Sequence, residues 1–495
     1  MDTRTAIFSK LVKDFMREVP LAVRRRAPIG DVARKMAEAG ASSATVTDSD
    51  DHPVGIVTEQ DITRRVAFQV DAGSLVDDVM TAPVSTIRSD EYLYYAIARM
   101  RRANLRHMPV VDADGRLVGM LNLPDALAAT SETLMGQIDA LTQEDSIDGL
   151  TQIKAAQVDL ADQLFRDNLP AGEIQALLTY VNNDIYRRIV DLNLIAMAAE
   201  GLGEAPVAFA VIVMGSGGRG ENFLFPDQDN GFILDDYPDD RHTAIDGWFI
   251  DLAERMTRDL DRVGVPLCKG NVMATNPLWR KTISQWQEQI RRWSQKRNVT
   301  TLRLCDIFFD FRAVWGDTAP ADVLRRFVTR IAGGNHAFLR EMCEDDIDHR
   351  VALGWFGRFV TEREDKDHKG KINLKHTGTL PLVEAMRLLS LREGVEAIST
   401  VGRMNALHEK GVLDEDEHDY LTSAFRHLST LLLRQQIEDF KAGRTVSNYV
   451  HPNSLTERER DMLIESFKAI RALRKRMGTE FTGEMFSPAA YSGGA

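Results

Sequence analysis

The N-terminal quarter of the chain is an internal repeat, and this repeat restricts the fold more than any other feature. When the sequence is shifted by 64 residues against itself, the two copies match without a gap. Each copy reads as an amphipathic helix, a short apolar strand, a turn that contains Asp, a second strand and another helix. The matched pairs include Leu11 and Leu75, Val12 and Val76, Asp14 and Asp78, Met16 and Met80, Met36 and Met100, and Gly55 and Gly119. The repeat therefore predicts two similar α/β modules that pack as a pair.

Each copy ends in a short run that is suited to binding a nucleotide. The first copy contains GIVTEQD, which ends at Asp61, and the second contains GMLNLPD, which ends at Asp125. These runs resemble the binding signature of the CBS domain, which works as a tandem pair and commonly self-associates. The resemblance implies that Thr58, Asp61, Asn122 and Asp125 bind an adenine nucleotide and that the chain is a homodimer. Alternatively, the two aspartates only begin helices.

Composition and charge exclude several classes of protein. The net charge of −13 gives the chain no general attraction to nucleic acid or to anionic membranes. Cys268, Cys305 and Cys343 are far apart, so they predict neither a disulfide framework nor a zinc site. No stretch reaches the ~18 apolar residues of a membrane span, and the N-terminus lacks the apolar core of a signal peptide. We therefore expect a cytoplasmic chain that has no contact with a membrane.

Apolar periodicity divides the rest of the chain into further regions. After the repeat at 1–130, residues 131–203 have the spacing of two helices and predict a spacer or scaffold. Residues 204–320 mix strands with helices, whereas 321–485 read as amphipathic helices separated by short polar breaks. The last ten residues, 486–495, are predicted to be disordered. We expect a multidomain α/β and all-α protein that joins the tandem pair, a mixed sheet and a C-terminal helical bundle.

A glycine-rich turn follows the most apolar strand of the chain. The strand VAFAVIVM runs into GSGGRGEN, then PDQDN, and then a second apolar stretch. Gly215, Gly217 and Gly220 also spell the G-x-G-x-x-G fingerprint of dinucleotide-binding folds. That fold needs a full helix after the glycines, but only five residues separate Gly220 from the helix-breaking Pro226. The turn therefore does not predict a Rossmann fold.

Two aspartates after this turn predict a metal site. On an extended chain Asp227 and Asp229 project to the same side, because residues two apart share a face. Paired carboxylates suit Mg²⁺ or Mn²⁺, and this metal would offset the charge that builds on a phosphate under attack. Gly215 and Ser216 offer backbone N–H groups and a hydroxyl to a triphosphate, and Arg219 is close enough along the chain to reach the same phosphates.

The pattern GSGGRGEN…PDQDN resembles the nucleotidyltransferase domain of the bacterial PII uridylyltransferase. It is most similar to a family of signal-transduction nucleotidyltransferases that carry CBS or cyclic-nucleotide-binding repeats at the N-terminus. The resemblance extends over essentially the whole chain. It implies that Gly215 and Ser216 bind the nucleotide phosphates and that Asp227 and Asp229 bind metal. The uridylyltransferase also has HD-type hydrolase and ACT domains, which we do not find in this sequence.

Further site residues are expected in two later segments. A strand is predicted over residues 302–317, and it places Asp306, Asp310 and Arg312 on one face. Asp310 is the best candidate for a third metal ligand and for the catalytic base, with Asp306 as the runner-up and a buried ion pair with Arg312 as the alternative. Lys371 and Lys375 precede a helix and are expected to reach the triphosphate, unless they form a solvated basic loop.

The sequence thus predicts an Mg²⁺-dependent enzyme of the uridylyl- or adenylyltransferase type. It would transfer a nucleoside monophosphate from a nucleoside triphosphate to an acceptor hydroxyl, under regulation by an adenine nucleotide bound to the repeats. The sequence leaves a signalling protein, a small molecule and RNA open as the acceptor, and the acidic net charge makes nucleic acid the least favoured of them. The alternative is a regulator without catalysis, which senses nucleotides and uses the transferase fold as a docking platform.

Overall fold

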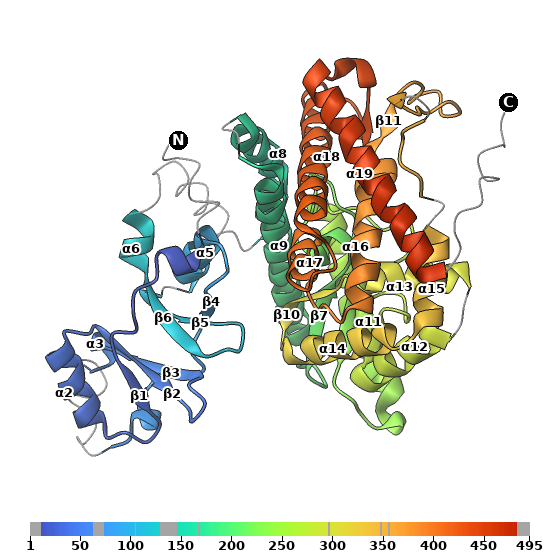
Figure 1. Cartoon of the computed structure of the whole chain (residues 1–495). Coiled ribbons are helices and arrows are strands. Elements are labelled where there is room, and N and C mark those ends of the chain that lie inside the picture. Colours follow the sequence, from blue (N-terminus) through green and yellow to red (C-terminus); the bar gives the residue numbers. More distant parts are fainter. Residues whose placement is uncertain are drawn as a thin grey trace. The chain divides into compact units, whose positions relative to one another are not determined.

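The chain folds into two compact units, Met1–Glu144 and Asp145–Ala495 (Figure 1). The computed structural model describes residues 11–62, 74–103, 105–128, 146–166, 169–295, 298–346, 349–354 and 357–482. The predicted disordered tail, 486–495, lies outside the described residues. No helix within the described ranges is both long and apolar enough to cross a membrane.

The first unit contains two three-stranded sheets, one from each copy of the repeat. In each sheet the first two strands are parallel, and the second and third form an antiparallel hairpin. The sheets are β1 (Ala22–Arg24), β2 (Ser43–Thr47) and β3 (Pro53–Thr58), and β4 (Ile87–Arg88), β5 (His107–Val111) and β6 (Leu117–Asn122). The helices are α2 (Ile29–Ala39), α3 (Glu59–Asp61), α5 (Leu93–Arg102) and α6 (Leu123–Ala128). The predicted pair of α/β modules is therefore present.

The two copies exchange their opening segments. The backbone N–H of Val12, from the start of the first copy, donates to Glu91 O of the second copy at 2.8 Å. In the same way, Val76 N of the second copy donates to Ala27 O of the first at 2.8 Å. Because each copy contains a segment supplied by the other, the pair forms one intertwined unit.

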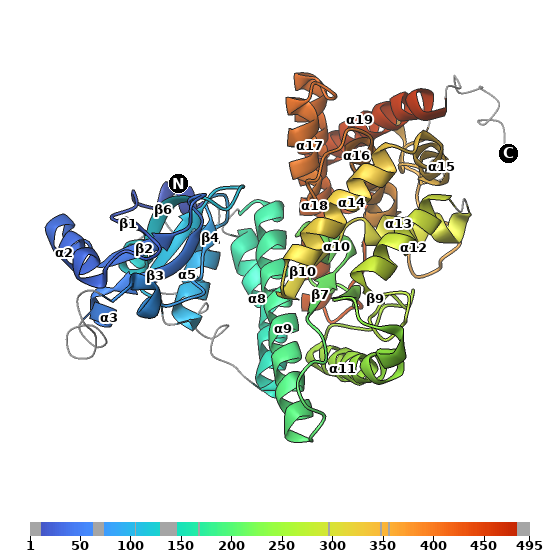
Figure 2. The same cartoon turned by 90° about the horizontal axis from the view of Figure 1, so that it is seen from below.

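The second unit is built on a mixed four-stranded sheet. The strand order is β10 (Arg312–Gly316), β7 (Phe209–Val213), β8 (Asn230–Leu234) and β9 (Arg280–Thr282). Only β8 and β9 are parallel. Helix α11 (His242–Val263) contributes Phe249 to one face, where its ring lies 5.0 Å from that of Phe209. Helices α12 (Ile283–Gln295) and α13 (Val299–Phe308) pack on the other face (Figure 2).

The predicted two-helix spacer is part of this second unit. Helices α8 (Ile147–Arg166) and α9 (Ala171–Ala199) form an antiparallel hairpin that packs against α11 and α18 (Glu415–Lys441) (Figure 1). The Lys154 ammonium on α8 is buried, and it donates to Leu224 O at 3.0 Å in the loop that precedes β8. The hairpin is therefore a wall of the second unit, which agrees with the predicted scaffold.

The strand predicted over residues 302–317 is wrong in its first half, which forms α13. The side chain of Asn298 caps this helix by accepting from Thr301 N at 2.9 Å. Leu302, Cys305 and Phe308 are buried at intervals of three, which is the spacing of a helix face. The aromatic and β-branched composition favoured a strand, but the cap and this apolar stripe favour a helix, and only β10 remains extended.

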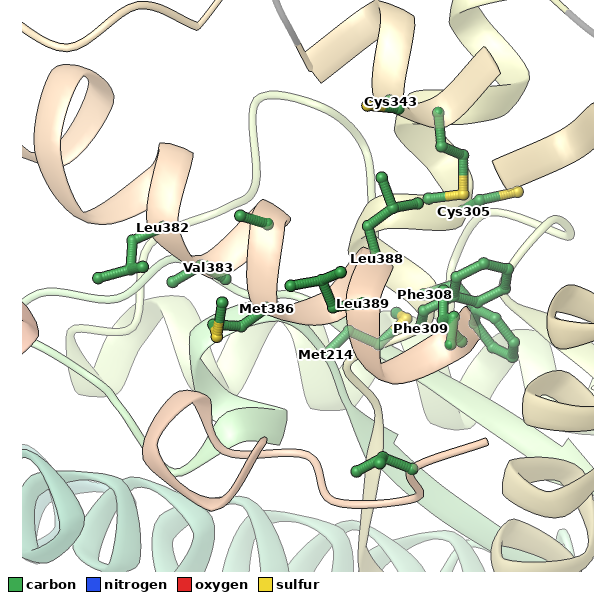
Figure 3. Close-up of a cluster of buried hydrophobic side chains, with 14 of the residues drawn as sticks. Met214, Cys305, Phe308, Phe309, Cys343, Leu382, Val383, Met386, Leu388 and Leu389 are labelled. Carbon is green, nitrogen blue, oxygen red and sulfur yellow. The ribbon is translucent and has the colours of Figure 1, made fainter. Parts of the chain in front are cut away.

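The C-terminal third is helical, as the sequence predicted. Its helices are α14 (Ala319–Gly333), α15 (His336–Asp346), α16 (Leu380–Arg392), α17 (Thr400–Glu409), α18 and α19 (Glu457–Thr482). A two-stranded ribbon, β11 (Ile372–Asn373) with β12 (Tyr449–Val450), accompanies them. Figure 3 shows Leu382, Met386 and Leu389 of α16 in one apolar cluster with Phe308 and Met214. This core holds the C-terminal helices against the sheet, at the end of β7 where the glycine-rich turn begins.

Candidate active site

The two predicted metal ligands lie directly before β8. Gln228 between them is fully buried, and its Nε2 donates to Thr257 O at 3.0 Å and to Val265 O at 2.9 Å. Because Gln228 is anchored on one side of the extended chain, Asp227 and Asp229 project from the other. Asp227 is exposed and Asp229 is half-buried. The structure therefore brings together the two carboxylates that the sequence singled out.

Cys268 joins this pair, a residue that the sequence analysis did not select. One ligand atom each from Asp227, Asp229 and Cys268 lies within 4.8 Å of the others. Burial and the negative charge of Asp227 raise the pKa of Asp229 to about 7. Burial and Asp229 likewise raise the pKa of Cys268 to about 12, so this side chain is a neutral thiol at physiological pH. Its only sequence signal is its position next to KGN, a segment without a recognisable motif.

The glycine-rich turn lies against the acid pair. Gly215 has a φ of +58°, and a Cβ at this position would lie 3.2 Å from Asp229 Oδ2. Glycine is therefore required both by the left-handed backbone and by the close approach of the carboxylate. Ser216 Oγ donates to Asn222 Oδ1 at 3.0 Å. The predicted phosphate-binding residues and the predicted metal ligands thus face each other across this turn.

Asp310, the predicted third ligand, lies in an ion-pair network instead. Its side chain is fully buried, and its oxygens accept from Arg219 at 2.7 Å, Arg387 at 2.7 Å and Arg403 at 2.6 Å. Burial alone would raise the pKa of Asp310, but the charges of the three arginines hold it well below its ordinary value. Asp306 accepts from Arg387 at 2.7 Å. Neither acid belongs to the cluster of Asp227, Asp229 and Cys268.

The three basic side chains that the sequence singled out have different surroundings. Arg219 lines the cavity beside Asp227, but its guanidinium also pairs with Glu221 at 2.7 Å. Lys375 lines the same cavity, is exposed, and lowers the pKa of Asp229 by its charge, although burial outweighs this effect. Lys371 does not line the cavity, and its Nζ donates to Asp367 O at 3.3 Å. Lys375 is therefore the cation best placed for a phosphate.

The two predicted nucleotide half-sites of the first unit have different surroundings. Thr58 Oγ1 accepts from Asp61 N at 3.3 Å and Asp61 Oδ2 accepts from Thr58 N at 3.0 Å, which forms a capping box at the start of α3. Thr58 Oγ1 also donates to Asp61 Oδ2 at 2.7 Å. In the second copy Asp125 accepts from Arg17 at 2.7 Å and from Asn122 at 3.2 Å. In the second half-site, an arginine therefore pairs with the carboxylate.

Curated relatives match a limited part of the chain. An uncharacterised protein from Methanopyrus kandleri is 32% identical over 99 residues, which cover 20% of this chain and 50% of that protein. A homoserine O-acetyltransferase from Methanococcoides burtonii is 34% identical over 114 residues, which cover 23% of each chain. The chain thus spans half or less of the length of these relatives.

Solved structures match a region of similar size. A CBS domain protein from Pyrobaculum aerophilum complexed with AMP is 27% identical, with coverage of 26% of this chain and 98% of that one and a TM-score of 0.24. A CBS-pair protein from Arabidopsis thaliana is 25% identical, with coverage of 26% and 96% and a TM-score of 0.22.

Family models match both units of the chain. The CBS domain matches residues 12–67 and 76–132. The family described as "Putative nucleotidyltransferase DUF294" matches residues 155–300, and the "Putative nucleotidyltransferase substrate binding domain" matches 336–481. The resemblance to CBS-containing nucleotidyltransferases is confirmed by these matches. The chain belongs to the family that joins a CBS domain pair to a DUF294 nucleotidyltransferase domain and its substrate-binding domain.

Proposed function

We propose that the second unit transfers a nucleoside monophosphate from a nucleoside triphosphate to an acceptor hydroxyl. The observation that carries this proposal is the convergence of Asp227 and Asp229 on the Gly215–Ser216 turn. In the reaction the acceptor oxygen bonds to the α-phosphorus, the bond from that phosphorus to the bridging oxygen breaks, and pyrophosphate leaves. The hydroxyl proton passes to solvent.

The acid pair fits a magnesium ion. Two carboxylates whose oxygens lie close together repel each other unless a cation or a proton intervenes, and oxygen ligands of this kind are those that Mg²⁺ prefers. The neutral Cys268 thiol is a poor ligand for a hard cation, so Asp227 and Asp229 would hold the metal. When bound, Mg²⁺ supplies positive charge next to the phosphates.

The chain's own groups orient the triphosphate around that position. The Ser216 hydroxyl and the Lys375 ammonium both line the cavity that contains Asp227, so they would contact phosphate oxygens there. Arg219 contributes positive charge from the wall of the cavity while it anchors Asp310. The buried network behind this wall keeps the turn in place as the triphosphate enters and leaves.

The CBS pair would serve as the sensor of this enzyme. We propose that an adenine nucleotide binds the first half-site, where the Thr58 hydroxyl and the Asp61 carboxylate lie together at the start of a helix. Such a ligand regulates transfer only if it binds one state of the chain more tightly than another, because equal affinity shifts no equilibrium.

Label transfer tests the proposed reaction. The full chain is incubated with each of the four α-³²P-labelled nucleoside triphosphates, Mg²⁺ and an extract of cells. We expect one nucleotide to label an acceptor, with release of pyrophosphate, and the identity of that nucleotide separates uridylyl from adenylyl transfer. Absence of labelled acceptor with all four nucleotides, over a range of adenine nucleotide concentrations, would favour the non-catalytic regulator.

A further inference from the structure

We propose that the cavity beside Asp227 receives the heterocyclic base of the nucleoside triphosphate. This inference rests on the proposed nucleotidyl transfer and adds to it a base-recognition site made by the helical C-terminal part. The cavity is lined by Ser216, Asp227 and Lys375 and also by Phe223, Phe425 and Ser429. The first three are the groups assigned to the phosphates or to the metal, so the rest of the lining is available to the nucleoside.

Two amides in the wall have orientations that backbone groups determine. Glu221 O can only accept, so Gln175 must present Nε2 to it, at 3.1 Å, and this leaves Gln175 Oε1 as an acceptor. Leu224 N can only donate, so Gln436 presents Oε1 to it, at 3.2 Å, while Gln436 Nε2 donates to Asn448 Oδ1 at 3.0 Å. The amide nitrogen of Asn448 is then left as a donor. Gln175, Gln436 and Asn448 all line the cavity.

Two buried polar atoms of the wall lack partners. Gln175 Oε1 and Ser429 Oγ have no hydrogen-bond partner among the described residues, and each side chain belongs to a residue that is only 1% exposed. Buried polar groups nearly always form hydrogen bonds. Two such atoms without a partner in the lining of one cavity therefore indicate that a ligand or water binds to them there. The acceptor is Gln175 Oε1, the donor is the amide nitrogen of Asn448, and the hydroxyl of Ser429 can act as either. Together they match a heterocycle that carries both N–H donors and ring acceptors on one edge.

The remaining walls suit a flat ring. Phe223, Phe425, Leu380 and Val383 supply apolar surface around the polar atoms. Bases are commonly held between aromatic or apolar side chains while their edges form hydrogen bonds. The cavity volume of about 140 Å³ is well below the ~300–1,000 Å³ of sites that enclose a whole ligand. The cavity is therefore too small for the whole nucleotide and of a size for one ring system, with the phosphates next to the exposed Asp227.

A binding experiment on the full chain compares Ser429→Ala with Ser390→Ala. Ser390 on α16 is a matched control, because it is also 1% exposed with an unpaired Oγ, yet it does not line the cavity. Equilibrium dissociation constants are measured for the four nucleoside triphosphates and for inorganic tripolyphosphate, with Ca²⁺ in place of Mg²⁺ to prevent transfer. Both substitutions lie in the second unit, so nucleotide bound by the CBS pair contributes equally to every variant.

We expect at least one nucleoside triphosphate to bind more tightly than tripolyphosphate. Ser429→Ala should weaken binding of that nucleotide about 3- to 10-fold, the effect of one hydrogen bond, and leave tripolyphosphate unchanged. Ser390→Ala should change neither. Asn448→Asp, which replaces the donor with a carboxylate while keeping the acceptor for Gln436, should weaken the same nucleotide and is a second test at a half-buried position.

Two outcomes separate this inference from the proposed function. Equal affinity for nucleotides and tripolyphosphate, or equal effects of Ser429→Ala and Ser390→Ala, would overturn the base site even if label transfer proceeds, and would assign the unpaired atoms to water. The expected binding pattern without any label transfer would support the base site and contradict catalysis.

Discussion

At the scale of single residues, Asp310 shows how far a buried charge depends on its surroundings. The sequence marked this acid as unusual because it stands among aromatic side chains. Its partners come from α10 (Gly215–Arg219), α16 and α17, elements that are distant from it in the chain. A buried acid needs a metal or an ion-pair partner, and the local sequence offers only Arg312 as a partner, so it does not reveal the three arginines that pair with Asp310.

Removal of the Asp310 charge is expected to destabilise the second unit. In Asp310→Asn the buried Arg387 and Arg403 and the half-buried Arg219 would lose their shared counter-ion, which costs about 3–5 kcal/mol when a buried pair is broken. Asp306→Asn is the control. Asp306 pairs only with Arg387 within this network, so its substitution should lower the free energy of unfolding by less. Urea unfolding measures both free energies. Equal unfolding midpoints for wild type and Asp310→Asn would show that the network does not stabilise the fold.

Gly218 is expected to tolerate no side chain, whereas its neighbour Gly217 tolerates one. A Cβ at Gly218 would overlap the backbone carbonyl oxygen of Asp310, but a Cβ at Gly217 would meet Val213 Cβ at an ordinary 3.5 Å. Gly218→Ala should therefore lower the melting temperature by several degrees, and Gly217→Ala should leave it nearly unchanged. Similar melting temperatures for the two variants would contradict the close packing of the turn against residue 310.

At the scale of elements, the parts of the site that are continuous in sequence were predictable. The apolar strand, the glycine-rich turn and the acid pair follow each other within about thirty residues, and alternation along an extended chain placed both carboxylates on one side. Cys268, Gln175 and Ser429 were not predictable, because folding brings them to the site from separate helices and loops. Helix α13 was missed because its cap, Asn298, lies outside the aromatic segment that suggested a strand.

The packing of the α8–α9 hairpin predicts a pH dependence of stability. Burial lowers the pKa of Lys154 to about 7. Between this value and the ordinary pKa of lysine, the unfolded chain binds a proton that the folded chain does not, so stability rises with pH in this window. From pH 7 to pH 9 we expect Lys154 to contribute a rise of about 2 kcal/mol in the free energy of unfolding.

Lys154→Met should lack this rise. Urea unfolding of wild type and variant at pH 7 and pH 9 measures it, and only the difference between their pH slopes is informative, since other groups titrate equally in both. Parallel slopes would show that Lys154 keeps an ordinary pKa in the folded chain.

At the scale of the whole molecule, the repeat predicted two modules but not the exchange of segments between them. The exchange matters for binding because it brings Arg17 of the opening segment onto Asp125 of the second copy. Arg17 corresponds to Thr81 of the second copy, which pairs with Ile56 of the first copy and carries no charge. The two half-sites therefore differ by more than the replacement of Thr58 by Asn122. The homodimer that the resemblance implies stays a prediction.

Adenine nucleotide binding to the full chain should depend mainly on the first copy. Asp61→Ala should weaken binding of the preferred nucleotide among AMP, ADP and ATP more than Asp125→Ala does, because only the first copy has a hydroxyl, that of Thr58, where the second has Asn122. Titration calorimetry of both variants measures this difference. A larger loss in Asp125→Ala would reverse the assignment of the half-sites, and the absence of binding by wild type would leave the pair without a sensor role.

The most direct test of the central claim is transfer by variants of the acid pair. Asp227→Asn and Asp229→Asn should each lower the rate of nucleotidylated product formation, followed by mass spectrometry, by more than about 100-fold, because the proposed Mg²⁺ loses a carboxylate ligand. Both should melt near the wild-type temperature, and Asp419→Asn, at a carboxylate that is 82% exposed on α18, should retain full activity. Near-normal product formation by either variant of the pair would contradict the claim that Asp227 and Asp229 form the catalytic centre.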